Sequence, residues 1–432
     1  MHVAVSARHF AQLAAHSISW PKLRLASAVF AVTLAMGLAP AKAVETKFKA
    51  NPANCQNTNG PFDKWLVGIR EEAVKAGVKR QTVNAALDGV QYAPDIIRID
   101  RGQSFFSQAF LDFQTKLATP GRVSSGIMQM KKHAGTFQRA DAQWSVPASV
   151  ITAFWALESD FGSGIGNKPV MKSLATLAWD CRRGEMFKAE LMAALKVIDR
   201  GDLTPAEMVS SWAGELGQTQ LLPTHYLKHA VDFDGDGKAN LFKSSPDIIA
   251  STANFITSLG WKKGQPWLEE VRVPATLDWQ QADIAVKHPR SFWAKAGVTK
   301  ANGQPLPADA LPASLILLQG RGGPAFLAYP NFTIFTEWNQ SLNYATTAAY
   351  LATRLEGAPA LSKGAAPATP LVPDQIKELQ NLLNKAGYQG GEPDGRLGLG
   401  TRAAIRLAQA KLGLPADSYP TVELIDKLRQ KR

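Results

Sequence analysis

Residues 150–162 read VITAFWALESDFG, an apolar helical pattern that contains one glutamate, Glu158. Ile151, Phe154, Glu158 and Phe161 follow one another at intervals of three, four and three residues. This spacing places the four side chains on one face of a helix. The carboxyl group of Glu158 is therefore expected to point where the apolar side chains point, into the protein.

A glutamate in the core has two interpretations. Burial disfavours the charged form of a carboxyl group and raises its pKa, which is the state that a general acid needs. A buried glutamate that pairs with an arginine would have a structural role only. Asp160, two residues further on, projects to another helix face and is a poor partner for shared chemistry. The spacing thus predicts a buried acid and leaves both roles open.

The chain as a whole has 432 residues, enough for two to three domains at roughly 150 residues each. A hydrophobic content of 45% and a charged content of 19% are ordinary for a folded globular protein. The formal net charge is +12, and without the four basic residues of residues 1–43 it is +8, which suits an acidic polymer such as cell wall or nucleic acid, although solubility alone also explains it. The basic residues form no stripe along the sequence, so nucleic-acid binding is set aside.

Residues 1–43 predict a secretory signal peptide. They carry four basic residues and no acidic one, and the apolar run Leu25–Leu38 precedes the small-x-small site Ala41-Lys42-Ala43. A membrane-spanning helix would need about 20 apolar residues, and no cysteine follows at a lipoprotein position. We therefore expect cleavage near Ala43 and a periplasmic product without a membrane anchor.

Two cysteines remain after that site, Cys55 and Cys181. Export places them in an oxidising compartment, where one disulfide bond is plausible. Two buried free thiols are the competing interpretation. The sequence shows neither a zinc-binding spacing nor a Cys/His nucleophile pattern.

The hydrophobic periodicity predicts a mostly helical chain. The expected helices are Phe62–Ala76, Thr82–Leu87, Phe105–Leu117, Gly126–Phe137, Pro147–Phe161, Leu174–Leu177, Arg183–Ile198, Pro205–Trp212, Pro246–Leu259 and Tyr344–Leu355. The β-prone segments, which predict a small sheet or hairpins, are Leu268–Val273, Ser314–Leu318 and Phe332–Phe335. Residues 358–373 are rich in Ala, Pro, Gly and Ser, a composition typical of a semi-extended linker. We expect a main domain over residues 44–357 and a small domain of two or three helices over residues 374–432.

Two further segments carry polar side chains that could serve a site. In Ser211–Pro223, small residues alternate with amides, as in a tight loop that lines a cleft, although a capped helix end would look similar. In Asp232–Asn240, the acids Asp232, Asp234 and Asp236 stand at positions 1, 3 and 5 of an EF-hand loop, and Lys238 would lend its carbonyl at position 7. Position 12 holds Lys243 in place of glutamate, and Asp247 could supply the missing carboxylate. A calcium site and a metal-free turn both remain open.

A family resemblance rests on several motifs that occur in order along the chain. They are Trp155-Ala-Leu-Glu158, Phe161-Gly162, Ser173-Leu-Ala-Thr-Leu177, Ser211-x-Ala-Gly-x-x-Gly217-x-x-Gln220-x-x-Pro223, Val231-Asp-Phe-Asp-Gly-Asp-Gly237, Asn254 to Trp261, and Trp338-Asn339 with Tyr344-Ala345. Together they resemble the membrane-bound lytic murein transglycosylase B family over roughly residues 60–356. Linked motifs are specific where any one of them would be weak.

The resemblance implies a mainly α protein with a lysozyme-like α+β catalytic domain that acts on the glycan strands of peptidoglycan. Glu158 would be the catalytic acid and base, and Ser211, Gln220, Asn339 and Tyr344 would hold the N-acetyl sugars in the cleft. No cofactor would be required for the chemistry, and calcium would be structural.

This chain departs from the family pattern in the cleft. Phe113 and Phe255 stand where the best-known members have tyrosine, so ring stacking on a sugar can persist without the hydroxyl hydrogen bonds. Gln218-Thr219 replaces the more usual Tyr-Gly in the loop.

The small C-terminal domain has a resemblance of its own. Its motifs are Ile376-Lys-Glu-Leu-Gln-Asn-Leu-Leu383, Gly387-Tyr388, Pro393-Asp-Gly395, Leu397-Gly398 and Thr401-x-x-Ala-Ile405 with Gln409. They resemble the small peptidoglycan-binding domain appended to many wall enzymes. Ala408 stands where that domain usually has an aromatic residue.

The resemblance as a whole implies a lytic transglycosylase, a lyase that cleaves the β-1,4 bond between MurNAc and GlcNAc and leaves 1,6-anhydro-MurNAc ends. The alternative enzyme is a lysozyme-like hydrolase that uses two carboxylates. For that role Glu215 is the best second carboxylate, on a loop position expected to face solvent. A non-catalytic wall-binding scaffold is the other alternative, which an intact Glu158 disfavours. We expect a monomer whose partner is peptidoglycan.

Overall fold

The computed structural model describes residues 50–51, 54–102 and 108–430. The expected signal peptide lies outside these residues, as does the first part of the helix predicted over Phe105–Leu117. Across the described part of the chain, no helix combines the length and the apolar character that crossing a bilayer requires.

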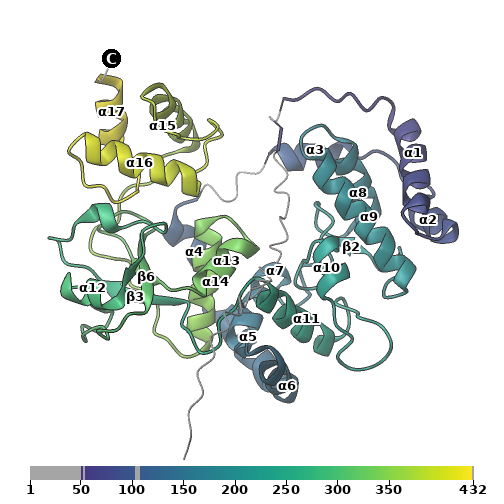
Figure 1. Cartoon of the computed structure of the whole chain (residues 1–432), viewed down its shortest axis with the longest axis horizontal. Coiled ribbons are helices and arrows are strands. Elements are labelled where there is room, and N and C mark those ends of the chain that lie inside the picture. Colours follow the sequence, from purple (N-terminus) through teal and green to yellow (C-terminus); the bar gives the residue numbers. More distant parts are fainter. Residues whose placement is uncertain (1–49, 52–53, 103–107, 431–432) are drawn as a thin grey trace, which may run out of the picture. The chain divides into compact units, whose positions relative to one another are not determined.

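The described chain is mainly helical, as expected, with two small sheets (Figure 1). Its α-helices are α1 Phe62–Lys75, α2 Arg80–Leu87, α3 Pro94–Arg101, α4 Phe110–Leu117, α5 Pro120–Lys132, α6 Ala134–Trp144, α7 Ala148–Ser159, α8 Val170–Trp179, α9 Gly184–Arg200, α10 Pro223–His229, α11 Ser245–Ser258, α12 Arg290–Lys295, α13 Phe332–Trp338, α14 Leu342–Leu355, α15 Pro373–Lys385, α16 Leu399–Lys411 and α17 Val422–Gln430. The helix predicted over Gly126–Phe137 is in fact two helices, α5 and α6, which meet at His133.

Helix α7 lies at the centre of the largest hydrophobic core. It packs against α5, α6, α11 and α14, and every residue from Ser149 to Ala156 is buried. A helix that is apolar on all sides belongs in a core, since no face of it favours water. The other helices are therefore arranged around α7, and Glu158 lies in its last turn.

The larger sheet is antiparallel, with the strand order β4-β6-β7-β3-β5. Its strands are β3 Leu268–Arg272, β4 His288–Pro289, β5 Thr299–Lys300, β6 Pro312–Leu317 and β7 Ala325–Ala328. This sheet and α12 enclose a second hydrophobic core, which includes Trp293, Leu315 and Leu327. The predicted strands at Leu268–Val273 and Ser314–Leu318 match β3 and β6, while the sequence pattern missed β7.

Two predicted elements are wrong. Phe332–Phe335, predicted as a strand, forms the first turn of α13, where the backbone N–H of Phe332 donates to the Tyr329 carbonyl at 2.8 Å. A run of four apolar residues does not separate a strand from a buried helix. Pro205–Trp212, predicted as a helix, contains β2 Val209–Ser210, which pairs with β1 Lys168–Pro169. That pairing holds the chain extended.

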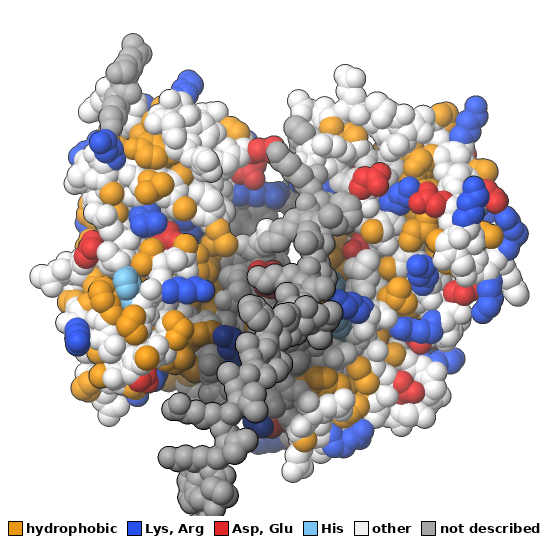
Figure 2. Space-filling model, viewed as in Figure 1, with side chains coloured by type: hydrophobic (Ala, Val, Ile, Leu, Met, Phe, Trp, Pro, Cys, Tyr) orange, Lys and Arg blue, Asp and Glu red, His pale blue; other side chains and the backbone are white. Residues whose placement is uncertain are grey.

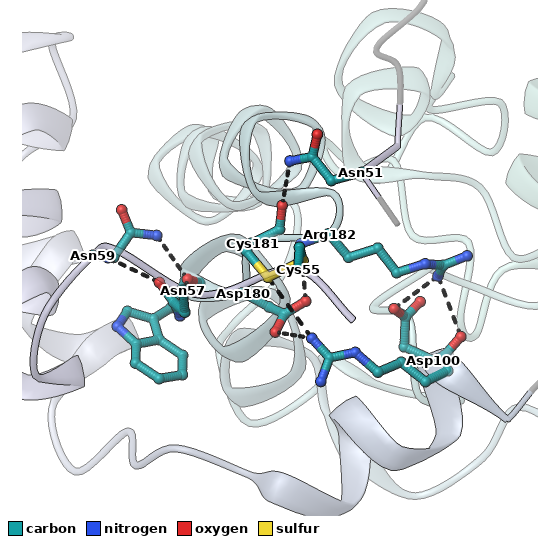
Figure 3. The surroundings of a disulfide bond; sticks show 10 residues. Asn51, Cys55, Asn57, Asn59, Asp100, Asp180, Cys181 and Arg182 are labelled. Carbon is teal, nitrogen blue, oxygen red and sulfur yellow. Dashed lines mark hydrogen bonds and ion pairs between the residues drawn. A yellow bond between two sulfur atoms is a disulfide. The ribbon is translucent and has the colours of Figure 1, made fainter. Parts of the chain in front are cut away.

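A disulfide bond joins Cys55 to Cys181, with 6.0 Å between the two Cα atoms and 126 residues between them in sequence (Figure 3). It fastens the segment before α1 to the chain just after α8. Side-chain amides reinforce the connection, since Asn51 donates to the Cys181 carbonyl at 2.7 Å and Asn57 donates to the Trp179 carbonyl at 2.8 Å.

The buried carboxylate of Asp100 secures α3 beside this disulfide (Figure 3). Asp100 is 2% exposed and forms ion pairs with Arg182, at 2.8 Å, and with Arg183. A buried carboxylate is tolerated when partners of opposite charge surround it. The chain after Cys181 is thereby fixed against α3.

The C-terminal helices α15, α16 and α17 enclose a core of their own, which includes Leu379, Leu383, Ile405 and Leu424. Residues 358–372, which precede them, form neither helix nor strand. This linker nevertheless follows the main domain closely. Ala366 N–H donates to the Gly322 carbonyl at 2.9 Å, and Ala368 N–H donates to the Gln319 carbonyl at 3.0 Å.

Helix α16 also contacts the main domain. Arg402 is 6% exposed and donates to the Leu318 carbonyl at 3.3 Å, while Arg406 pairs with Asp283 at 3.2 Å. The Ser418 hydroxyl donates to the Ala282 carbonyl at 3.1 Å. The small domain is therefore held against the main domain by buried polar contacts as well as by the chain.

Charged side chains of both signs are mixed over the face shown in Figure 2. Lysine and arginine side chains are spread across that face with acidic side chains among them. A surface of this kind favours solubility.

Candidate active site

The end of helix α7 determines where Glu158 lies. Asp160, Phe161 and Gly162 all adopt positive φ angles, of 49°, 59° and 93°, so the chain turns away directly after Ser159. Positive φ is uncommon for residues other than glycine and ends a helix. Because the helix ends there, no further helical turn covers Glu158, and its side chain is half-buried. Its carboxyl group nevertheless has protein groups around it.

Two side chains from other helices donate to the same oxygen of Glu158. The Tyr344 hydroxyl, on α14, donates to Glu158 Oε1, and Trp338 Nε1, on α13, donates to it at 2.7 Å. The Trp338 ring stacks on Phe154, with 4.0 Å between the ring centroids. Because three helices contribute to it, the position of the carboxyl group is fixed by the fold.

Burial is the largest influence on Glu158 and raises its pKa to about 7. The hydrogen bonds from Tyr344 and Trp338 favour the charged form and act in the opposite direction, while the charge of Glu215 raises the pKa further. Burial and the neighbouring Glu158 raise the pKa of Tyr344 well above its usual value, so its hydroxyl keeps its proton. Near neutral pH, Glu158 is thus present in both protonation states.

The loop from Ser211 to Gln220 is fastened to α7 on both sides of Glu158. Trp155 Nε1 donates to the side-chain oxygen of Gln218 at 2.8 Å, and the Ser159 hydroxyl donates to the Gln218 carbonyl at 2.6 Å. A Cβ atom on Gly162 would come within 2.6 Å of the Gln218 side chain, so glycine permits this close approach. Gln218, which replaces the tyrosine more usual in this family, therefore connects the loop to helix α7. The sequence pattern did not reveal this role.

The predicted cleft residues Ser211, Gln220 and Asn339 are each held by local hydrogen bonds. The Ser211 hydroxyl donates to Glu215 Oε2 at 3.0 Å. Gln220 Nε2 donates to the Gly217 carbonyl at 2.8 Å, and Asn339 Oδ1 accepts from Ser341 N–H at 2.9 Å. Of the predicted sugar-binding residues, Tyr344 is the one that contacts Glu158 directly.

The two predicted aromatic cleft residues pack against protein. Phe113 is fully buried on α4, so the structure does not place its ring on a surface that a sugar could reach. Phe255 is 5% exposed, and its ring lies 4.5 Å from that of His225 and 5.2 Å from that of Trp338. Trp338, which belongs to one of the quoted motifs but had no predicted role, contacts Glu158 in addition to Tyr344.

Glu215 is half-buried, whereas the sequence led us to expect a solvent-facing position. Burial raises the pKa of its carboxyl group, and the charge of Arg183 acts in the opposite direction. The loop folds inward at this point because Leu216 and Leu221 exchange two backbone hydrogen bonds, of 2.7 and 3.0 Å. A second carboxyl group, half-buried, therefore lies on the cleft loop.

The acidic loop after α10 is closed by Asp247, which is fully buried. Its two oxygens accept from the backbone N–H groups of Phe233 and Asn240 at 2.7 and 2.8 Å. Carboxylate oxygens of Asp232, Asp234 and Asp247 lie within 4.8 Å of one another, an arrangement that suits a hard divalent cation.

The other predicted members of this loop lie outside that cluster. Asp236 and Lys238 are exposed, and the Asp236 side chain accepts from Lys238 N–H at 2.9 Å. Lys243, at position 12, points elsewhere and pairs with Glu207 at 2.7 Å.

The geometry of the site defines a class of enzyme. An enclosed carboxyl group with a pKa near neutrality can donate a proton to a glycosidic oxygen and later accept one. The chain belongs to the family described as "Transglycosylase SLT domain", which it matches over residues 61–353. It is therefore a lytic transglycosylase, a peptidoglycan-cleaving lyase. Residues 373–428 match a second family, "Putative peptidoglycan binding domain".

Known relatives confirm the family resemblance and the fold class. Membrane-bound lytic murein transglycosylase B of Escherichia coli strain K12 is 30% identical over 284 residues, which are 63% of this chain and 76% of that protein. SltB3 of Pseudomonas aeruginosa, in complex with NAG-anhNAM-pentapeptide, is 41% identical with a TM-score of 0.80, over 86% of this chain and 100% of that one. Escherichia coli Slt35, in complex with calcium, is 27% identical with a TM-score of 0.59, over 72% and 96%.

Proposed function

We propose that this enzyme cleaves the β-1,4 bond between MurNAc and GlcNAc without water and leaves 1,6-anhydro-MurNAc ends, with Glu158 as both acid and base. The observation that carries the proposal is the enclosed Glu158 carboxyl group, hydrogen-bonded by Tyr344 and Trp338 and poised between its two protonation states. The complex of the related SltB3 with NAG-anhNAM-pentapeptide supports the product.

In the first step, protonated Glu158 donates its proton to the glycosidic oxygen as the bond to the MurNAc C1 breaks. Positive charge develops on the sugar ring, and Glu158 becomes a carboxylate that the Tyr344 and Trp338 donors stabilise. In the second step, the 6-hydroxyl oxygen of the same MurNAc bonds to C1, and its proton passes to Glu158. The acid is regenerated and no water is consumed.

Ser211, Gln220 and Asn339 would hold the sugars during these steps. Their side chains supply hydroxyl and amide groups on the cleft loop and after α13. Such groups suit the hydroxyl and acetamido groups of N-acetyl sugars, because they both donate and accept hydrogen bonds. The role of Tyr344 would be to hold Glu158 and to stabilise its carboxylate form.

The half-buried Glu215 on the cleft loop favours one alternative, a hydrolase that uses two carboxyl groups. The products separate the two reactions. Muropeptides released from purified wall are expected to be lighter by one water than those that a hydrolase releases. They are also expected to resist borohydride, because an anhydro end has no reducing group. Products that borohydride reduces would establish hydrolysis instead.

We also infer the setting in which the enzyme works. The name of the Escherichia coli relative refers to murein, the wall polymer outside the cytoplasm. This supports an extracytoplasmic, periplasmic site of action after removal of residues 1–43. Residues 44–357 would form the catalytic domain, residues 358–373 the connection, and residues 374–432 the domain that binds peptidoglycan.

We further propose that the acidic loop binds calcium for stability. Asp232, Asp234 and Asp247 would hold the ion through their clustered carboxylates. The ion would neutralise crowded acids around the buried Asp247, whose pKa burial and the charge of Asp234 both raise. The calcium complex of the related Slt35 supports this assignment.

Calcium added to chelator-treated protein is expected to raise the melting temperature by several degrees. A ligand that binds only the folded state, present at 100 times its Kd, stabilises it by about 2.7 kcal/mol. Asp234→Asn removes one charged ligand from an exposed position and should abolish the response while leaving the fold intact. Superimposable melting curves with and without calcium would contradict the proposal that the loop binds calcium.

A further inference from the structure

A small cavity lies where the main domain meets the C-terminal helices. Its volume is about 40 Å³. The first turn of α14 lines it from the main domain, with Ser341, Leu342 and Asn343, and Leu371 and Arg402 line it from the C-terminal side. We propose that this cavity binds one small monovalent anion, a halide ion or a carboxylate group, which connects the two domains. The inference is independent of the proposed reaction.

Arg402, on α16, is a buried cation without an ion pair among the described residues. It is 6% exposed. Its guanidinium group makes long hydrogen bonds to the Leu317 and Leu318 carbonyls, at 3.5 and 3.3 Å, and lies 5.6 Å from the centre of the Tyr419 ring. Its Nε atom has no hydrogen-bond partner in the described part of the chain. A charge removed from water in this way is costly unless an opposite charge accompanies it.

The two carboxylates nearest in effect to Arg402 are engaged with other donors. Asp283 forms an ion pair with Arg406 at 3.2 Å. Asp417 accepts two hydrogen bonds of 3.0 Å, one from a backbone N–H and one from the Gln409 side chain. Neither carboxylate lines the cavity. Burial lowers the pKa of Arg402 to about 10 in spite of their charges, so they do not compensate for the burial of this cation.

The N-terminus of α14 is the second positive feature of the cavity. The Ser341 hydroxyl oxygen accepts from Tyr344 N–H at 3.4 Å and so caps one of the first N–H groups of this helix. The backbone N–H groups of Leu342 and Asn343 have no acceptor among the described residues. Free N–H groups at the start of a 14-residue helix attract an anion, and the helix dipole adds to that attraction.

The size and charge of the cavity define the class of ligand. Arg402 is the one charged residue among the described residues that line it, and the others are apolar or neutral. One water molecule needs about 10–15 Å³ of such a cavity, so the available space suits a chloride ion or a carboxylate group and excludes a sugar ring. One guanidinium group and one helix end balance a single negative charge. The bound anion would contact both domains and stabilise their association.

The test is thermal unfolding of the intact protein in sodium chloride, sodium acetate and sodium gluconate at equal ionic strength. Gluconate is monovalent but too large for the cavity, so it reports the general effect of salt. Chloride at ten times its Kd should raise the melting temperature by about 2 °C above the gluconate value, and the difference should saturate. Acetate that acts like chloride would identify carboxylates as ligands of the site, and acetate that acts like gluconate would restrict the site to halides.

Arg402→Met removes the cation and keeps a long apolar side chain between the domains. This variant should lose the difference between chloride and gluconate. Arg406→Met is the matched control, because Arg406 lies on the same helix and also contacts the main domain, through Asp283, but does not line the cavity. It should be less stable than wild type and still respond to chloride.

Bromide provides a direct test that does not depend on a variant. Crystals of the wild-type protein in sodium bromide should show an anomalous peak in the cavity, in contact with the Arg402 guanidinium group and the start of α14. A cavity without bromide would overturn the inference. It would also be overturned by equal melting temperatures in chloride and gluconate, or by an undiminished chloride response in folded Arg402→Met.

Discussion

Glu158→Gln is expected to reduce the cleavage of purified peptidoglycan at least a thousandfold. In the proposed mechanism the carboxyl group is used twice, to protonate the glycosidic oxygen and to accept the proton of the 6-hydroxyl group, and an amide can do neither. General acid–base catalysis contributes about 10² to 10⁴ in rate for a single positioned group. Release of soluble muropeptides, followed by chromatography and mass spectrometry, measures the loss.

The same variant should fold and be more stable than wild type above neutral pH. The amide oxygen can still accept from Tyr344 and Trp338. The raised pKa of Glu158, about 7, means that the folded wild type binds more protons than the unfolded chain between about pH 4.5 and 7. The contribution of Glu158 to the free energy of unfolding therefore falls as pH rises through that window. Glutamine does not titrate, so the variant does not lose this contribution.

Glu190→Gln is the matched control for the loss of activity. Glu190 is a buried glutamate on α9 that accepts from Thr224 N–H at 2.8 Å, away from the hydrogen bonds around Glu158. An amide oxygen preserves that contact, so near wild-type activity is expected. Substantial activity in Glu158→Gln would show that another group supplies the proton.

Removing the disulfide bond through Cys55→Ser with Cys181→Ser is expected to lower the free energy of unfolding by about 4 kcal/mol. The bond closes a loop with a sequence separation of 126 residues, and loop closure of that size removes roughly 4–5 kcal/mol of entropy from the unfolded chain. Urea unfolding of wild type and the double variant measures the difference.

Wild-type protein in reducing buffer is the internal control for the disulfide. It should unfold at the same lower urea concentration as the double variant, and alkylation should then find two thiols where the oxidised protein has none. Equal stability in oxidising and reducing buffer would mean that the segment before α1 is held by its other contacts, among them the Asn51 and Asn57 hydrogen bonds.

Local spacing was sufficient to predict the central part of the site. Intervals of three and four residues placed Glu158 on the apolar face of α7, and its enclosed carboxyl group lies where that pattern requires. The motifs also named Tyr344, whose hydroxyl donates to Glu158 in the structure, while its predicted contact with sugar stays a prediction. These features follow from the geometry of a single helix or from linked sequence motifs.

Features that depend on contacts distant in sequence could not be predicted in this way. The role of Gln218 as an anchor requires Trp155 and Ser159 to be adjacent to it, and the inward orientation of Glu215 depends on a turn between two leucines. The strand predicted over Phe332–Phe335 is wrong for a similar reason. Four apolar residues fit a strand or a helix equally well, and the hydrogen bond from Phe332 N–H to the Tyr329 carbonyl is what starts the helix. Tertiary contacts decide such cases.

The hydrogen bonds from Ala366 and Ala368 to the main domain, together with the buried Arg402, change what the second domain can do. A module on a free tether raises the local concentration of its target and lets the catalytic site search a volume set by tether length. A domain that is held against its neighbour by hydrogen bonds does not sample such a volume. If the second domain binds peptidoglycan as proposed, these contacts would make it offer a bound strand to the catalytic domain in one fixed orientation.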